Sequence, residues 1–317
     1  MEPKPRKVAV VAFGGNALLR PEDRGTQDEQ IARAKQAARW LAEIVRHGYK
    51  LVIVHGNGPQ VGNILVQAEE ASTKIPPQTL DVAVAQTEGS IGYLLQTAMR
   101  NRLETLGHSC EVATILTEVE VDPNDLAFKK PTKPIGPFFT RYRAETLSRD
   151  YGWTMKEDSG RGWRKVVPSP RPLHILNLKT ISYMLQGADV VVAAGGGGIP
   201  VMRGRDNQWR GIEAVIDKDY ASAILAAELN AELYVVLTGV PKVAIDFGKP
   251  TERRLDRMTM AEAEKYLSEG QFPAGSMGPK IEAAIDFVRR SGHDVLITDV
   301  EHLREALEGN AGTRITR

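Results

Sequence analysis

The apolar residues of this chain fall into short unbroken runs, separated by longer stretches in which they recur every three or four positions. Six unbroken runs are rich in β-branched residues: VAVVAF (8–13), LVIV (51–54), VATILT (112–117), DVVVAA (189–194), YVVLT (234–238) and DVLIT (294–298). Successive side chains of a strand point to opposite faces, so a continuous apolar run predicts a strand that is buried on both faces. That pattern is typical of a parallel sheet.

The stretches between these runs carry a helical spacing. In residues 28–47, for example, one face collects Ile31, Ala34, Ala38, Leu41 and Val45. The same spacing predicts helices over residues 79–106, 174–186, 218–230, 259–268, 279–291 and 300–308. Because strands and helices alternate over most of the chain, we predict a three-layer α/β/α sandwich around an open, mainly parallel sheet.

One segment, residues 122–172, interrupts the alternation and is rich in proline. Its stretch KKPTKPIGPFFTRY cannot form a long helix, because proline removes backbone donors and clashes with the preceding turn. Its stretch GWTMKEDSGRGWRKVVPSP predicts a small hairpin. A structureless loop of this length is unusual inside a compact domain, so we interpret the segment as a protruding subdomain inserted at the edge of the sheet, within a single domain over residues 1–317. The alternative is a disordered insert, against which its aromatic residues and the WRKVV run argue.

Composition and charge narrow the class of protein. The 317 residues include 41 Lys and Arg against 40 Asp and Glu, so no basic excess indicates nucleic acid as a partner. The start, MEPKPRK, lacks the apolar core of a signal peptide, and no apolar stretch approaches the roughly 20 residues that span a membrane. The single cysteine, Cys110, excludes an intrachain disulfide. We therefore expect a cytoplasmic globular protein that handles small molecules, with neither nucleic acid nor a membrane as partner.

Three of the predicted strands run into glycine-rich turns, GGNAL, HGNGPQVG and GGGGIPV, each of which we expect to lead into a helix. In an open parallel sheet these turns lie along the carboxyl edge of the strands, where ligands bind. Glycine lets the backbone approach an anion, and the N–H groups of a helix start can point at it. A single turn serves ordinary tight packing equally well, but three on one edge predict an anion cradle. Its candidate residues are Gly14, Gly15, Asn16, Gly56, Asn57, Gly58, Gly196 and Gly197.

Two familiar phosphate-binding motifs are excluded. The chain has no G-x-x-x-x-G-K-[ST] loop. In GNGPQVG the third glycine comes one position too late for the dinucleotide fingerprint, and no acidic residue ends the next strand to bind a ribose. An NAD-dependent enzyme is therefore disfavoured.

Three lysines and one aspartate are the candidate catalytic residues. Lys280, in GSMGPK, falls in the first turn of a predicted helix, where the dipole disfavours a cation; either it points into solvent or an anion lies there. In AVIDKDYAS, Asp219 caps or opens a helix, and Lys218 taken alone would be a solvated lysine. Lys133, in PTKPIGP, has its backbone stiffened by prolines but could equally be a surface lysine in a turn.

Eight stretches together give the chain a resemblance to the carbamate kinases of the amino acid kinase superfamily over nearly its full length. They are GGNAL, HGNGPQVGN, PTKPIGPFF, GWRKVVPSP, AAGGGGIPV, AVIDKDYAS, EGQFPAGSMGPK and GNAGT. The glycine motifs are shared with related kinases. KPIGPFF, GWRKVVPSP and GSMGPK are more specific, because the inserted subdomain is characteristic of carbamate kinases.

The resemblance implies reversible phosphoryl transfer between ATP and carbamate, giving ADP and carbamoyl phosphate. It implies that Mg²⁺ is held mainly by phosphates and water, with no direct protein side-chain ligand. The first two glycine turns would hold carbamate and the transferred phosphoryl group. Residues 1–212 would then form mainly the acceptor side, and residues 213–317 mainly the nucleotide side.

The resemblance also implies roles for single residues. Lys218 and Lys280 would contact the nucleotide phosphates, Asp219 would orient both lysines, and Lys133 would reach in from the inserted subdomain. The nucleotide side would further include Asp217, Thr238, Val240 and Met277, the last three near the base.

Carbamate is already an anionic oxygen nucleophile, so the reaction needs no catalytic base, and we expect His55 only to pack a turn at a strand end. Two departures from the family pattern leave substrate and nucleotide preference open. Many members read AMSQG-IGY where this chain has AQTEGSIGY (85–93), which adds the charge of Glu88 on a helix expected to face the substrate or a dimer partner. Pro241 stands where an aspartate is common.

Two other functions compete with this interpretation. A related kinase acting on another small carboxylate, such as glutamate or acetylglutamate, would lack the KPIGPFF insert. A catalytically silent nucleotide-binding regulator would have lost one of the three lysines, and all three are present. The direction of the reaction is open, with ATP synthesis during arginine or purine-derived catabolism favoured, and the long apolar helices predict a homodimer.

Overall fold

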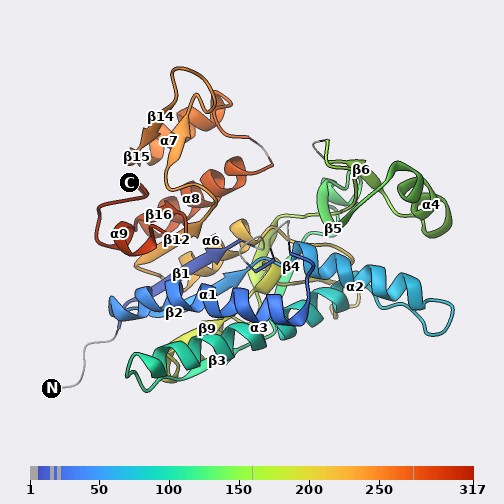
Figure 1. Cartoon of the computed structure of the whole chain (residues 1–317), viewed down its shortest axis with the longest axis horizontal. Helices are drawn as coiled ribbons and strands as arrows, with labels where there is room; N and C mark the ends of the chain where they lie inside the picture. The colour runs from blue at the N-terminus through green and yellow to red at the C-terminus, as the bar shows by residue number, and fades with distance from the viewer. Residues whose placement is uncertain (1–5, 15–17, 20–22, 159, 274) are drawn as a thin grey trace.

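The computed structural model describes residues 6–14, 18–19, 23–158, 160–273 and 275–317. Its centre is an eight-stranded sheet in the order β15-β17-β16-β12-β1-β2-β9-β3 (Figure 1). The strands are β1 (Val8–Phe13), β2 (Lys50–His55), β3 (Val112–Thr114), β9 (Val190–Val192), β12 (Leu233–Leu237), β15 (Arg257–Thr259), β16 (Val295–Thr298) and β17 (Thr313–Thr316). All neighbours are parallel except β16 and β17. The mainly parallel sheet predicted from the unbroken apolar runs is confirmed.

Helices cover both faces of this sheet, which confirms the three-layer sandwich. One layer contains α1 (Gln27–Arg46), α3 (Leu80–Thr105) and α9 (Leu303–Leu307); the other contains α5 (Leu178–Gly187), α6 (Lys218–Glu228) and α8 (Met277–Ser291). Alternate residues of β1 join different layers: Ala9 and Val11 pack in the same cluster as α1 and α3, whereas Val10 and Ala12 pack with α6 and α8. This division explains why β1 is apolar at every position.

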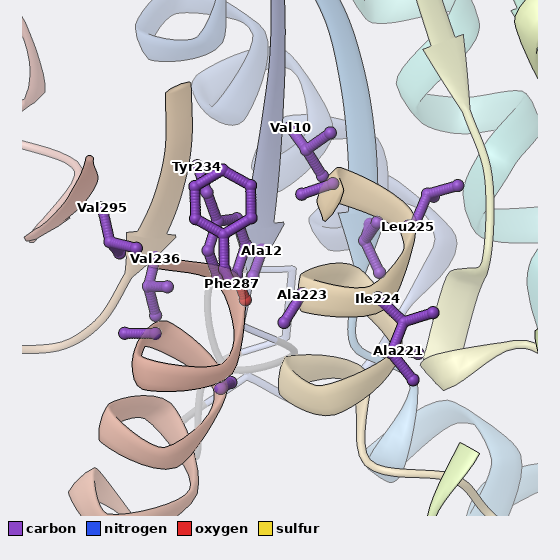
Figure 2. Packing of buried hydrophobic residues seen from close by; sticks show 14 of the residues in the cluster. Val10, Ala12, Ala221, Ala223, Ile224, Leu225, Tyr234, Val236, Phe287 and Val295 are labelled. Carbon is purple, nitrogen blue, oxygen red and sulfur yellow. The ribbon is translucent and has the colours of Figure 1, made fainter. Parts of the chain in front are cut away.

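The contact between β12, α6 and α8 fixes the start of α6. Figure 2 shows Tyr234 of β12 beside Phe287 of α8, and their ring centroids are 5.3 Å apart. Both side chains are fully buried. The Tyr234 hydroxyl donates a hydrogen bond of 3.1 Å to the backbone oxygen of Asp219 and shares another with Ser222. A buried tyrosine hydroxyl needs such partners, and here they tie the first turn of α6 to the core.

The proline-rich segment forms a small unit that rises from the body of the molecule (Figure 1). It contains the three-stranded antiparallel sheet β5 (Lys133–Phe139), β7 (Trp163–Val167) and β6 (Met155–Glu157), the helix α4 (Arg141–Tyr151) and a short 3₁₀ turn η2 (Leu126–Phe128). The hairpin predicted for residues 152–170 is present as β6 and β7. The boundaries 122–172 of the subdomain stay a prediction.

A second sheet lies at the base of this unit. Its order is β11 (Trp209–Gly211), β10 (Ile199–Arg203), β4 (Glu118–Val121) and β8 (Pro172–Ile175). Because β4 and β8 are antiparallel neighbours, the chain leaves for the unit and returns from it at adjacent positions. The pairing also corrects one predicted helix: residues 172–175 belong to β8, and α5 begins only at Leu178.

Two glycines let the projecting unit touch the body closely. Gly62 of α2 (Gly58–Ala71) lies against Gly136 of β5, and a Cβ atom on Gly62 would come within 1.9 Å of the Gly136 Cα. Gly136 also has a positive φ of 72°. Only residues without a side chain can pack this closely, so the position of β5 over α2 depends on both glycines.

The remaining elements complete the carboxyl-terminal part of the chain. They are α7 (Met260–Ser268) and the two-stranded antiparallel sheet β13 (Val243–Ile245) with β14 (Arg253–Leu255). Among the helices formed by the described residues, none has both the length and the apolar character needed to cross a bilayer.

Candidate active site

A cavity of about 600 Å³ opens at the carboxyl ends of the central strands. Its wall includes Gly14 after β1, the turn 56–58 after β2 and Thr238 after β12. The projecting unit adds Lys133 and Arg164, and the starts of α6 and α8 add charged residues. The cavity therefore lies where ligands bind in open parallel sheets.

The turn after β2 leads into a helix, as its sequence predicts. The N–H group of Gly56 donates to the Phe13 oxygen at 2.9 Å, which joins this turn to the end of β1. Asn57 precedes α2, and its Nδ2 donates to Thr87 Oγ1 at 2.8 Å. Gly58 is the first residue of α2, so the amino-terminal end of this helix lies at the cavity wall. Of the first glycine turn, Gly14 lines the cavity, while Gly15 and Asn16 lie outside the described residues.

The third glycine turn departs from its prediction, because it does not lead into a helix. Residues 195–197 form the short 3₁₀ turn η3, and the chain then enters the strand β10. Positive φ angles at Gly196, Gly197 and Gly198 turn the chain away from a right-handed helix. Gly196 lines the cavity beside Asn57, whereas a Cβ on Gly197 would come within 2.6 Å of the Ile216 oxygen, which places that glycine against the core.

The three candidate lysines all line this cavity, and each meets a carboxylate there. Lys133 Nζ donates to Asp217 Oδ2 at 2.8 Å, and Lys280 Nζ donates to Asp219 Oδ2 at 3.1 Å. The other oxygen of Asp219 accepts from Lys218 Nζ. Ammonium groups from β5, α6 and α8 are thus brought together by two carboxylates at the start of α6.

The local structure of α6 explains why both carboxylates face the cavity. Asp217 is the N-cap residue, and its Oδ1 accepts from the Asp219 N–H at 3.0 Å. Asp219 falls in the first turn and is only 3% exposed. Negative charge is favoured at this end of a helix, so the helix start helps to hold two acids close together.

The lysines also control the ionisation of these acids. Burial raises the pKa of Asp217, but the ammonium groups of Lys133 and Lys218 and the Asp219 N–H together lower it by more, so the net pKa is below its ordinary value. Burial likewise opposes ionisation of Asp219, and the Lys218 and Lys280 ammonium groups overcome that effect and lower its pKa. Both carboxylates are therefore charged at neutral pH.

Lys280 lies in the first turn of α8, as predicted, and its ammonium points to the cavity rather than to open solvent. Besides Asp219, it donates to the Ser276 backbone oxygen at 3.2 Å. The Asp219 carboxylate compensates for the unfavourable dipole at this helix start.

Of the three candidate residues for the nucleotide base, Thr238 lines the cavity, whereas Val240 and Met277 do not. Thr238 lines the cavity and its N–H group donates to the Thr298 oxygen at 2.9 Å. Val240 is half-buried outside the lining, and Met277 packs against the hydrophobic core at the start of α8.

Arg164 and Trp40 are among the cavity residues that were missed in the sequence. Arg164 of β7 donates from Nε to the Gly136 oxygen at 3.1 Å and pairs with Asp158, and burial lowers its pKa. The motif GWRKVVPSP could have pointed to Arg164, because it is one of the stretches more specific to carbamate kinases and contains this arginine. Trp40 of α1 also reaches the cavity, and nothing in the helical pattern sets it apart.

His55 and Glu88 lie beneath the cavity wall. His55 is fully buried, and burial lowers its pKa to about 4, so it packs a turn as a neutral ring. The helix that carries Glu88 was expected to face the substrate or a partner, but the Glu88 side chain itself is buried inside the chain, where it accepts from the Thr117 N–H. Burial raises the pKa of Glu88 well above its usual value, so it does not add the negative charge that its residue type suggests.

The described residues contain no group of three or more histidine, cysteine or acidic side chains that could hold a metal ion. The two carboxylates of the cavity each bind lysine ammonium groups.

Comparisons with known proteins show which proteins the chain resembles. The model of the amino acid kinase family matches residues 7–299. The chain is 46% identical to the carbamate kinase of Pyrococcus furiosus over 98% of this chain and 99% of that protein, and it is also 46% identical to the carbamate kinase-like protein YqeA of Escherichia coli, again over 98% and 99%. It superimposes on a structure of the Giardia lamblia carbamate kinase bound to AMP-PNP with a TM-score of 0.90, at 40% identity over 98% of each chain.

Proposed function

Since the chain belongs to the amino acid kinase family, and within it to the carbamate kinases, we propose that it catalyses reversible phosphoryl transfer between ATP and carbamate, giving ADP and carbamoyl phosphate. One observation carries the proposal: three ammonium groups from separate parts of the chain meet two carboxylates at the wall of one cavity. Glycine-rich turns form another part of the same wall. Such an arrangement suits two anionic ligands that must be held end to end.

The chemistry needs position and charge rather than proton transfer. A carbamate oxygen attacks the γ-phosphorus of ATP, a new P–O bond forms, and the bond to the β–γ bridging oxygen breaks so that ADP leaves with the electron pair. No proton moves, and the neutral, buried His55 is not needed as a base. The protein must instead align the two oxygens and neutralise the charge on the equatorial oxygens.

The lysines are suited to that task. Asp217 and Asp219 hold the lysine ammonium groups, so the protein itself sets the positions of these charges. Lys218 and Lys280 are proposed to contact the nucleotide phosphates, with Asp219 orienting both. Lys133 is proposed to contact the transferred group from the side of the projecting unit. Fixed donors of this kind are worth a few kcal/mol each in the transition state.

Magnesium is proposed as part of the nucleotide substrate. A bound Mg²⁺ would bridge phosphate oxygens and neutralise part of their charge. Because the cavity carboxylates are occupied by lysines, we propose that phosphates and water supply its ligands, with no direct side-chain ligand.

The test is an assay of ATP formation from carbamoyl phosphate and MgADP, coupled to a reporter enzyme. Glutamate, acetylglutamate and aspartate are offered in parallel as phosphoryl acceptors from MgATP. We expect turnover with carbamoyl phosphate alone. Turnover with one of the other carboxylates would instead identify a related kinase, and nucleotide binding without any turnover would identify a silent regulator.

Other properties remain proposals. We propose that residues 1–212 form mainly the acceptor side and residues 213–317 mainly the nucleotide side, and that the base binds near Thr238. Net flux towards ATP in arginine or purine-derived catabolism, and a cytoplasmic location, rest on the family resemblance alone. A homodimer is supported by large exposed apolar side chains such as Tyr93 on α3 and Tyr183 on α5, and sedimentation equilibrium would test it.

A further inference from the structure

The buried face of α3 contains two polar side chains directly beneath the candidate active site. Val84, Thr87, Glu88 and Ile91 follow the helical spacing that faces the core, and all four are buried. Thr87 is fully buried and Glu88 is 2% exposed. An uncompensated carboxyl in such a place is costly, so its presence calls for a function.

These two residues each support one loop of the cavity wall. Thr87 Oγ1 accepts a hydrogen bond of 2.8 Å from Nδ2 of Asn57, in the turn after β2. Glu88 Oε2 accepts one of 2.8 Å from the backbone N–H of Thr117, in the loop before β4. One turn of α3 therefore supports two loops, the turn after β2 and the loop before β4.

Thr117 in turn clamps both ends of the glycine loop. Its Oγ1 accepts from the Ala194 N–H at 2.9 Å, and its backbone oxygen accepts from the Ile199 N–H at 2.8 Å. Ala194 has a positive φ of 49°, which is unfavourable for a residue with a side chain. Between these two ends lies Gly196, which lines the cavity. Glu88 thus acts on the cavity wall through Thr117.

Two buried atoms near this loop lack partners among the described residues: Oε1 of Glu88 and Nε2 of His55. The Nδ1 atom of His55 is 3.1 Å from the Gly56 oxygen, which can only accept, so Nδ1 carries the proton. The ring is neutral, because burial lowers its pKa to about 4, and Nε2 is left as an acceptor without a donor.

Glu88 presents the complementary group. Burial raises its pKa, and the N–H groups of Thr117 and Gly195 offset only part of that effect, so the protonated form is favoured. Because Oε2 accepts from Thr117, the proton belongs on Oε1, which is then a donor without an acceptor. Both groups adjoin Gly195: its N–H acts on Glu88, and a Cβ on Gly195 would come within 2.2 Å of His55 Nε2.

We propose that Glu88 is a positioning residue for phosphoryl transfer that acts as a neutral carboxylic acid: Oε2 holds the Thr117 N–H, and the Oε1 hydroxyl donates through one water to Nε2 of His55, beside the Gly195 backbone. The role in catalysis rests on the proposed kinase function. Three side chains lie around Glu88: His55 from β2, Asn57 from the turn before α2, and Thr117 from the loop before β4. Among these three, His55 is the titratable one. A carboxylate here would place negative charge under a wall that must bind anions.

The first test needs no activity. Infrared difference spectra between the wild-type protein and Glu88→Gln are recorded at neutral pH. We expect the wild type to show the carbonyl band of a protonated carboxylic acid that Glu88→Gln lacks, and ¹⁵N NMR to show His55 protonated at Nδ1 with Nε2 accepting a hydrogen bond. A carboxylate band, or a His55 ring protonated at Nε2, would overturn the proposal.

The second test separates a positioning role from simple packing. Glutamine can still accept from Thr117 and offers an N–H donor, so Glu88→Gln should keep kcat/KM within about threefold. Leucine removes both functions and leaves the Thr117 N–H unpaired, so Glu88→Leu should lower kcat/KM roughly tenfold. Thr114→Val is the matched control, because it removes another buried hydroxyl oxygen without a partner, which packs against Gly92 of the same helix.

The pH dependence gives a further readout. In the wild type, kcat/KM should fall at alkaline pH as Glu88 ionises, and this decline should be absent or weaker in Glu88→Gln. Equal activity of Glu88→Leu and wild type, or an equal loss in Glu88→Gln and Glu88→Leu, would refute the positioning role. If the wild type proves inactive with carbamoyl phosphate, the proposed function fails separately, and calorimetric titration of the same variants with AMP-PNP decides whether Glu88 shapes the wall. If Glu88→Leu does not fold, the spectra and Glu88→Gln still decide.

Discussion

Replacing Lys280 with alanine should slow turnover about 100-fold while the fold remains intact. The Lys280 side chain is 17% exposed, lines the cavity and lies 3.1 Å from Asp219. In the free protein its loss leaves Asp219 paired with Lys218, so the stability cost is limited to one charge-assisted hydrogen bond, about 1.5–3 kcal/mol. In the transition state the same ammonium would face phosphoryl oxygens, and a loss of about 2.7 kcal/mol there corresponds to a 100-fold slower reaction.

The matched control is Lys179→Ala. Lys179 also falls in the first turn of a helix, α5, but it is exposed and is not among the residues that line the cavity. Initial rates with varied MgADP at saturating carbamoyl phosphate would give kcat and KM for both variants, and circular dichroism would verify the fold. We expect Lys179→Ala to match the wild type. A Lys280→Ala variant whose kcat stays within about threefold of the wild type would remove this lysine from the proposed mechanism.

Four further outcomes are expected. Lys133→Ala should also slow ATP formation about 100-fold, and unchanged kinetics would mean that the projecting unit does not contribute to the reaction. Asp219→Asn should cost about 3 kcal/mol or more in urea unfolding, because two largely buried ammonium groups lose their shared carboxylate; a loss below about 1 kcal/mol would contradict this. Gly62→Ala should lower the melting temperature by several degrees, since its Cβ would collide with Gly136, whereas an unchanged melting temperature would show that β5 moves aside easily. Folding lowers the pKa values of Asp217 and Asp219, so their charged forms stabilise the folded protein at pH values above the ordinary carboxyl pKa of about 3.9. This stabilisation is lost as the pH falls through the pKa values of the folded protein. The melting temperature should therefore drop below about pH 4, and it should drop less steeply in Asp219→Asn.

The central sheet was predictable because strands that are buried on both faces have continuous apolar runs in the sequence. The β1 run is apolar at each position since it contacts both helix layers, and that requirement can be seen in six residues. The glycine run before Ile199 shows the limit of such reasoning. Glycines permit either a helix or a strand to follow, and here the pairing of β10 with β4, a tertiary contact, decides for the strand.

The candidate site shows a similar division. The unusual settings of Lys133, Lys218 and Lys280 could be recognised in the sequence, but the ion pairs that join them cross up to 84 positions and depend on the fold. Arg164 was overlooked because a charged residue in a short hairpin resembles any solvated side chain. Glu88 was misjudged because its residue type suggests charge, whereas its burial favours the neutral form.

The two carboxylates and three ammonium groups of the cavity have a kinetic consequence. The whole chain carries a formal charge of only +1, so long-range attraction for anionic substrates must come from the uneven distribution of charge rather than from its total. At physiological ionic strength such attraction is screened beyond about 8 Å. Added salt should therefore slow the capture of both substrates while leaving the rate of the bound reaction nearly unchanged.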